Sequence, residues 1–183
     1  MEILEFADVD HWDAWLTEHH DRASEAWLRL RRARSELPLI STGEALDCAL
    51  CHGWIDGLAR SFDDVSRLQR YSPRRPQSPW SQVNVAKVEA LMAAGRMRPG
   101  GLAQVEAARA DGRWDAAYPS QAQATVPPDL AEALAATPGA AAAFDRLSRS
   151  ARYALMLPVF RARTPAGRAG VVRRVVSRLA DGD

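Results

Sequence analysis

The residues best suited to binding chemistry lie between Arg74 and Asn84. Within eleven residues the chain places two arginines, two hydroxyl groups, an indole and an amide, at Arg74, Arg75, Ser78, Trp80, Ser81 and Asn84. A guanidinium can hold two oxygens of a carboxylate or phosphate at once, and free amides at a helix N-terminus also favour an anion. The spacing therefore predicts a corner that binds a small anionic ligand.

Asp56 is the second part of this hypothesis, because it stands at the start of a predicted strand and directly before a glycine. We expect Asp56 to orient the two arginines, and Trp80 to form an apolar wall. Two structural alternatives stay open. Asp56-Gly57 can be a plain turn, and the arginines can lock the loop by bonding backbone carbonyls and Asp56 or Asp63, with Trp80 in the core. Exposure of at least one guanidinium in a concave site that contains Asp56 would favour binding.

The string Cys48-Ala49-Leu50-Cys51-His52 resembles three known kinds of site. It has the spacing for c-type haem attachment, but nothing indicates the exported setting that this chemistry needs. A redox pair would need its first cysteine at a helix N-terminus, and here both thiols come late in a predicted helix. A zinc site would need a further ligand from His11, His19 or His20, which the spacing does not support. We therefore expect two small, partly buried thiols and no metal or cofactor.

A small antiparallel sheet is expected to position these residues in the N-terminal part. Strands are predicted at residues 3–6 and 26–31, and a β-hairpin over residues 54–71 around Asp63-Asp64. Asp8 caps one helix between them. Ser41 and Glu44 form a capping box for a second helix, which Gly53 ends. Three prolines then make residues 72–81 a stiff loop.

The second half of the chain is predicted to hold about six helices. Ser81 caps the first, and Pro99 and Pro128 stand in the first turns of two more. Thr137-Pro138 and Thr164-Pro165 each combine a capping threonine with a proline at the first helical position. The fold class is therefore α+β, with a helix-rich C-terminal half.

Length and composition fit one ordinary soluble domain. The 183 residues are 47% hydrophobic and 26% charged, which excludes collagen, coiled coil and intrinsic disorder. We expect a single domain over residues 1–183, with a sheet-containing part at 1–80 and a helical part at 81–183. The chain has no basic, apolar leader and no run of about 18 apolar residues, so we expect no membrane span and a cytoplasmic location.

Charge is unevenly distributed along the chain. Nine arginines and no acid lie between Arg146 and Ala180, although the whole chain has 24 basic and 23 acidic residues. Such a segment can bind an acidic partner such as nucleic acid, or it can pack on an acidic part of the same molecule. We expect no nucleic-acid binding at physiological salt.

The chain resembles the YdeI/OmpD-associated family of bacterial proteins, often labelled bacteriocin-protection proteins. The resemblance rests on these residues: Ala49-Leu50-Cys51, Gly53 to Gly57, Ser72 to Arg75, Ser78, Trp80-Ser81, Asn84, Gly95-Arg96-Met97, Pro99, Gly101, Gly112 to Trp114, Ala117-Tyr118 and Thr164-Pro165 to Arg168. His52 and Cys48 depart from the family, which more often has an aromatic residue and an acid there. The resemblance implies a role in antimicrobial-peptide or stress resistance, and it implies no reaction or catalytic residue.

Three function hypotheses follow from the sequence. The first is a cytoplasmic protein that binds a small anionic ligand through Arg74 and Arg75, with Ser78, Ser81 and Asn84 supplying further hydrogen bonds. The second is a nucleic-acid-binding module that uses the C-terminal arginines. The third is an enzyme with Asp56 as general acid or base, for which the sequence shows no strong nucleophile or metal motif. The sequence predicts neither the ligand nor the oligomeric state.

Overall fold

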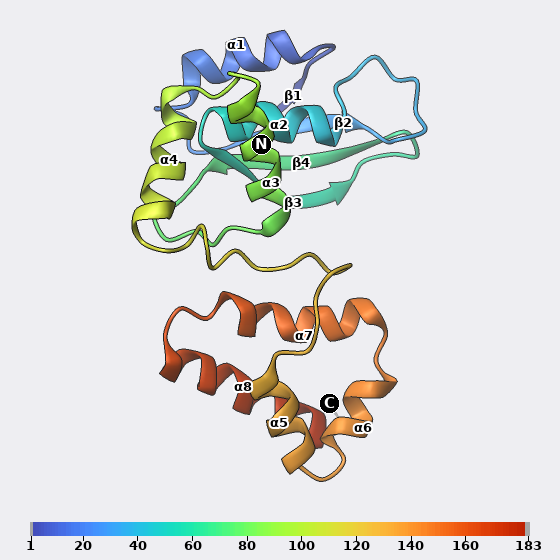
Figure 1. Cartoon of the computed structure of the whole chain (residues 1–183). Coiled ribbons are helices and arrows are strands. Elements are labelled where there is room, and N and C mark those ends of the chain that lie inside the picture. The colour runs from blue at the N-terminus through green and yellow to red at the C-terminus, as the bar shows by residue number, and fades with distance from the viewer. Residues whose placement is uncertain (1, 182–183) are drawn as a thin grey trace. The chain divides into compact units, whose positions relative to one another are not determined.

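A computed structural model describes residues 2–181 and confirms the α+β class, with four strands and eight helices in that range (Figure 1). The chain forms two compact units. The first holds the residues up to Trp80 together with Asn84–Ala116, and the second holds Ser81–Val83 together with the residues from Ala117 on. The single domain expected over residues 1–183 stays a prediction, and each unit is described by itself below.

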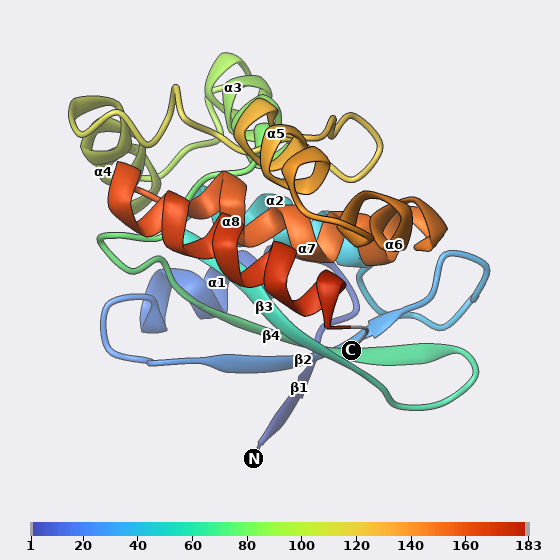
Figure 2. The same ribbon diagram turned by 90° about the horizontal axis from the view of Figure 1, so that it is seen from below.

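The first unit contains a sheet of four strands, β1 (Ile3–Glu5), β2 (Ala26–Arg31), β3 (Trp54–Ser61) and β4 (Ser66–Pro73), in the order β1-β2-β4-β3 (Figure 2). The predicted hairpin is confirmed as β3 and β4, and β2 is antiparallel to β4. The sheet is mixed rather than wholly antiparallel, because β1 and β2 are parallel. Helix α1 (Val9–His19) connects these two strands, and such a crossover returns the chain in its original direction.

The helices of the first unit begin where local signals predict them. The side chain of Asp8 accepts the His11 N–H at the start of α1, and Ser41 and Glu44 form the capping box of α2 (Thr42–Cys51). Helices α3 (Gln82–Ala93) and α4 (Pro99–Ala110) follow, and the first two residues of α3 belong to the second unit. These caps are hydrogen bonds between residues three apart, so the sequence shows them directly.

The core of the first unit forms where α1 and α2 pack against the sheet. Buried residues from both helices and from three strands meet there, including Trp12, Leu16, Leu28, Ala45, Trp54 and Tyr71. The rings of Trp12 and Trp54 pack edge to face with centroids 6.5 Å apart. Trp12 also donates its indole N–H to the carbonyl of Ala45, which ties α1 to α2. This packing fixes the relative position of the two helices that carry the cluster described below.

The second unit packs four helices around its own apolar core: α5 (Pro128–Ala136), α6 (Ala140–Arg146), α7 (Arg149–Arg161) and α8 (Pro165–Ala180). The prediction at Thr164-Pro165 is confirmed, with Thr164 as the N-cap. The prediction at Thr137-Pro138 is wrong, because α6 begins at Ala140 after Gly139 in a left-handed conformation. The Thr137 hydroxyl instead donates to the Ala133 carbonyl at the end of α5. None of the helices described is both long and apolar enough to span a membrane.

Candidate functional site

Arg74 is a packing residue of the loop that follows β4. Its side chain is buried, with 5% exposure, and its guanidinium carbon lies 3.6 Å from the ring centroid of the equally buried Trp80. The guanidinium donates to the Pro79 carbonyl at 3.3 Å, and the Arg74 backbone N–H donates to the Gly53 carbonyl at 3.0 Å. For Arg74 and Trp80 the geometry therefore agrees with the alternative in which the arginine locks the loop by bonding a backbone carbonyl and Trp80 lies in the core.

Arg75 differs, because its side chain is exposed at the turn of the same loop. Its backbone N–H donates to the Ser78 hydroxyl at 3.2 Å, and the Ser78 N–H donates back to the Arg75 carbonyl at 2.9 Å. The buried Arg113 donates to the Ser78 carbonyl at 3.0 Å and to Asp111, which holds the turn from its other side. The loop thus presents one exposed guanidinium on a fixed backbone.

The other predicted site residues lie outside this turn. Asp56 is exposed on the edge strand β3, where Tyr71 is its partner across the ladder. Asn84 is half-buried on α3. Ser81 belongs to the second unit, where its backbone forms a bridge with Tyr118. The structure therefore brings Arg74, Arg75, Ser78 and Trp80 together in one loop, and the roles predicted for Asp56, Ser81 and Asn84 stay predictions.

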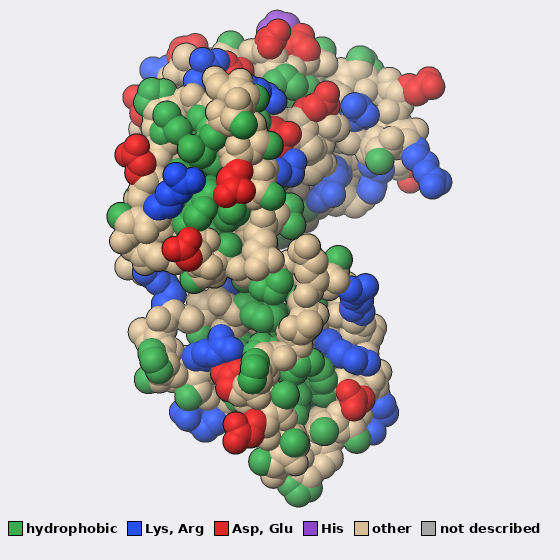
Figure 3. Space-filling view, viewed as in Figure 1, with side chains coloured by type: hydrophobic (Ala, Val, Ile, Leu, Met, Phe, Trp, Pro, Cys, Tyr) green, Lys and Arg blue, Asp and Glu red, His purple; other side chains and the backbone are tan. Residues whose placement is uncertain are grey.

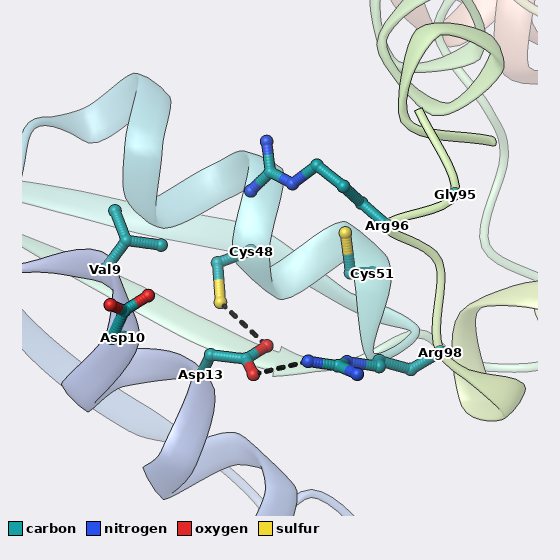
Figure 4. Close-up of a pocket in the computed structure, with 8 residues that line it drawn as sticks. All are labelled: Val9, Asp10, Asp13, Cys48, Cys51, Gly95, Arg96 and Arg98. Atoms are coloured by element: carbon teal, nitrogen blue, oxygen red, sulfur yellow. Dashed lines mark hydrogen bonds and ion pairs between the residues drawn. The ribbon is translucent and has the colours of Figure 1, made fainter. Parts of the chain in front are cut away.

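A second polar cluster joins three elements of the first unit around Asp13 of α1. One carboxylate oxygen, Oδ1, lies 2.8 Å from His52 Nε2 and 3.7 Å from Cys48 Sγ. The other oxygen, Oδ2, accepts from the Arg98 guanidinium at 2.7 Å (Figure 4). Cys48 and His52 are buried, whereas Asp13 and Arg98 remain accessible to solvent. Sequence reasoning missed Asp13, because only packing brings α1 against the end of α2.

The sequence explains locally why these side chains converge. Cys48 lies in the last turn of α2 and His52 is its C-cap, four residues on, so both lie on the same side of this helix end. At this end of the helix, Arg98 donates its backbone N–H to the Cys51 carbonyl at 3.0 Å. The first turn of α4 comes so close that a Cβ on Gly101 would lie 2.2 Å from the same carbonyl oxygen. Only glycine permits this approach, and the approach places Arg98 beside Asp13.

The environment of the cluster shifts the pKa values of its members. Burial, assisted by the charge of Asp13, raises the pKa of the Cys48 thiol. Burial also lowers the pKa of His52, which favours the neutral imidazole, although the hydrogen bond to Asp13 opposes this shift. Burial acts to raise the pKa of Asp13, but hydrogen bonds from His52 and Arg98 outweigh it and the pKa is lowered. An ionised carboxylate only accepts, so His52 Nε2 carries the proton of their hydrogen bond.

A hollow of about 290 Å³ opens beside this cluster. Its lining comes from α1, from α2 and from the segment between α3 and α4: Val9, Asp10, Asp13, Cys48, Cys51, Gly95, Arg96 and Arg98. Figure 4 shows the Arg96 side chain extending over the two cysteines. Burial raises the pKa of the Cys51 thiol as well, and the charge of Arg96 opposes this shift. Cys48 and Asp13, two members of the cluster, thus border the hollow.

Two segments of the chain match two different known families. Residues 4–104 match a family described as a domain of unknown function (DUF8412), and residues 123–182 match the family described as bacteriocin-protection, YdeI or OmpD-associated. The predicted resemblance is thus confirmed for the C-terminal segment that holds Thr164, Pro165 and Arg168. The residues between Ala49 and Gly101 that also carry the predicted resemblance lie within the match to DUF8412. No curated protein and no solved structure matches the chain.

Proposed function

We propose that this chain, which belongs to the DUF8412 family and carries a YdeI/OmpD-associated bacteriocin-protection segment, is a cytoplasmic protein that binds a small anionic ligand. Its biological role would be stress or antimicrobial-peptide resistance. The observation that carries the proposal is the exposed Arg75 on a loop that Arg74, Trp80 and Arg113 hold in place.

The fixed loop supports binding for an energetic reason. Ordering a flexible polar loop uses up part of the interaction energy with a ligand, whereas a loop already in place loses little freedom on binding. Arg75 would hold two oxygens of a phosphate or carboxylate through its planar guanidinium. The Ser78 hydroxyl accepts from the Arg75 N–H and keeps its own hydrogen to donate to an anion.

Titration calorimetry with inorganic phosphate tests this proposal. Arg75→Lys keeps the charge but loses the planar pair of donors, so phosphate affinity should fall by more than about tenfold, or about 1.4 kcal/mol. Arg34→Lys is the matched control, because Arg34 is also an exposed arginine on another loop of the same unit. The proposal fails if the natural chain shows no saturable phosphate binding, or if both variants bind like the natural chain.

One observation favours nucleic-acid binding by the second unit as a second candidate. Seven of the nine arginines between Arg146 and Ala180 are exposed, and several lie on the face of α5–α8 seen in Figure 3. Among the described residues, Arg168 alone of the nine forms an ion pair, with Asp129 at 2.7 Å. The exposed arginines are thus available to neutralise phosphates.

Fluorescence anisotropy with a labelled DNA duplex tests the second candidate. We expect no tight binding at about 150 mM salt, because the same unit also carries acidic residues such as Asp129, Glu132 and Asp145. Micromolar or tighter affinity that falls steeply as salt is raised would put nucleic-acid binding above anion binding. Arg173→Gln, in the exposed part of α8, should then reduce both the affinity and its salt dependence.

A further inference from the structure

Although the sequence pattern by itself predicts no metal, we propose that Asp13, Cys48 and His52 form a binding site for Zn²⁺ in the first unit. Their three ligand atoms, a carboxylate oxygen, a thiol sulfur and an imidazole nitrogen, all lie within 4.8 Å of one another. These are the three donor types that zinc uses in proteins. Two of them come from the C-terminal end of α2, from its last turn and its C-cap, and the third from the facing helix α1, so the ion would bridge the helices.

The cluster is organised as metal sites are. Cys48 and His52 are 2% and 5% exposed, so their side chains are held by packing rather than by solvent. Asp13 directs Oδ1 toward both of them, while Arg98 holds Oδ2 at 2.7 Å. A hydrogen bond to the second oxygen of a ligating carboxylate is the usual outer support of such a ligand.

The charges and protons of the site also balance. On binding, the Cys48 thiol releases its proton to solvent, and the His52 proton moves from Nε2 to Nδ1 so that Nε2 can ligate. The resulting thiolate and the Asp13 carboxylate carry two negative charges, which match the charge of Zn²⁺. The positive charges of Arg96 and Arg98 at the hollow oppose the cation, so we expect weaker affinity than at sites built from four cysteines.

Three protein ligands beside an accessible hollow leave a coordination position open. Closed structural zinc sites use four protein ligands, whereas sites with three keep one position for water or another small molecule. Here that position would face the hollow beside Arg96. Cys51 also lines the hollow, but it lies outside the group of three converging ligands. It therefore provides a matched control from the same helix turn.

The test uses the full chain, stripped with a chelator and titrated with Zn²⁺ in phosphate-free buffer against a coloured competing chelator. We expect one ion per chain, and with Co²⁺ a thiolate-to-metal charge-transfer band. Cys48→Ser should weaken Zn²⁺ binding by more than about tenfold and abolish the cobalt band, while Cys51→Ser should stay within about twofold of the natural chain. Phosphate is absent, so this outcome is independent of anion binding at Arg75.

Three results would overturn the proposal. They are substoichiometric zinc in the natural chain, equal binding by Cys48→Ser, and an equal loss in Cys51→Ser, each of which indicates an adventitious metal or another site. Circular dichroism of each variant verifies that the fold is retained. If Cys48→Ser does not fold, Asp13→Asn, a change at a more exposed side chain, should weaken Zn²⁺ binding in the same titration, and unchanged zinc binding by that variant would contradict the proposal.

Discussion

The loop around Arg74 and the cluster around Asp13 distribute their polar groups in opposite ways. In the loop, residues close in sequence mostly bond one another, and Arg74 is buried on Trp80, which leaves Arg75 exposed. In the cluster, Asp13 and Arg98 are 85 positions apart, and a hollow opens beside them. Polar groups that are close in sequence can thus bond mainly to one another within a loop. Groups that are distant in sequence can converge beside a hollow that a ligand can enter.

The largest effect should come from removing the support of the loop. Trp80 is 2% exposed and packs between Arg74 and Trp114, whose ring centroid is 4.9 Å away. Its indole N–H makes no hydrogen bond within the described chain, so Trp80→Ala mainly loses packing. We expect it to lower the free energy of unfolding by about 3–5 kcal/mol, measured by urea denaturation. A loss below about 1 kcal/mol would show that Trp80 does not hold the loop.

Disrupting the cluster around Asp13 should lower the free energy of unfolding of the metal-free protein less than Trp80→Ala does. His52→Ala removes a buried ring and its hydrogen bond to Asp13, but the carboxylate remains partly exposed and keeps Arg98 as a partner. We expect a loss of about 2 kcal/mol in chelator-treated protein. If the loss equals that of Trp80→Ala, the cluster supports the fold as strongly as the loop residues do, and the contrast between the two regions disappears.

The turn between β3 and β4 extends the comparison to a third polar cluster, in which all partners of the Asp63 carboxylate except Arg29 are close in sequence. Hydrogen bonds from Ser66 and Val65, together with Arg29, lower the pKa of Asp63 to about 2. A lowered pKa stabilises the fold above the ordinary pKa of 3.8, and this contribution is lost as pH falls through about 2. Asp63→Asn should therefore be less stable than the natural chain at pH 6. The difference should shrink between about pH 4 and pH 2 in thermal melts, and a pH-independent difference would contradict this assignment.

The smallest effect is expected at the exposed arginine of the loop. Arg75→Ala leaves the backbone bonds with Ser78 in place and removes only a solvated side chain. The free energy of unfolding should change by less than about 0.5 kcal/mol. Arg74→Ala is the contrasting variant, because it removes the buried stack on Trp80 and should cost more. Equal values for the two variants in parallel urea titrations would remove the distinction drawn between these neighbours.

The sequence by itself determined the elements whose signals lie within three or four residues. The caps at Asp8, Ser41 and Thr164 and the hairpin around Asp63 are local arrangements, so they are present as predicted. The failure at Thr137 has a local cause as well. One hydroxyl can serve either the end of one helix or the start of the next, and nothing in the residue types decides between them.

Tertiary structure decided what depends on contacts between distant segments. The parallel pairing of β1 with β2 follows from the path through α1, and the burial of Arg74 follows from where Trp80 packs. The grouping of Asp13 with Cys48 and His52 required α1 to pack on α2, and that of Arg98 required the close approach at Gly101. The spacing of these residues in the sequence does not predict such contacts. They form because burying the whole apolar core lowers the free energy of the folded chain.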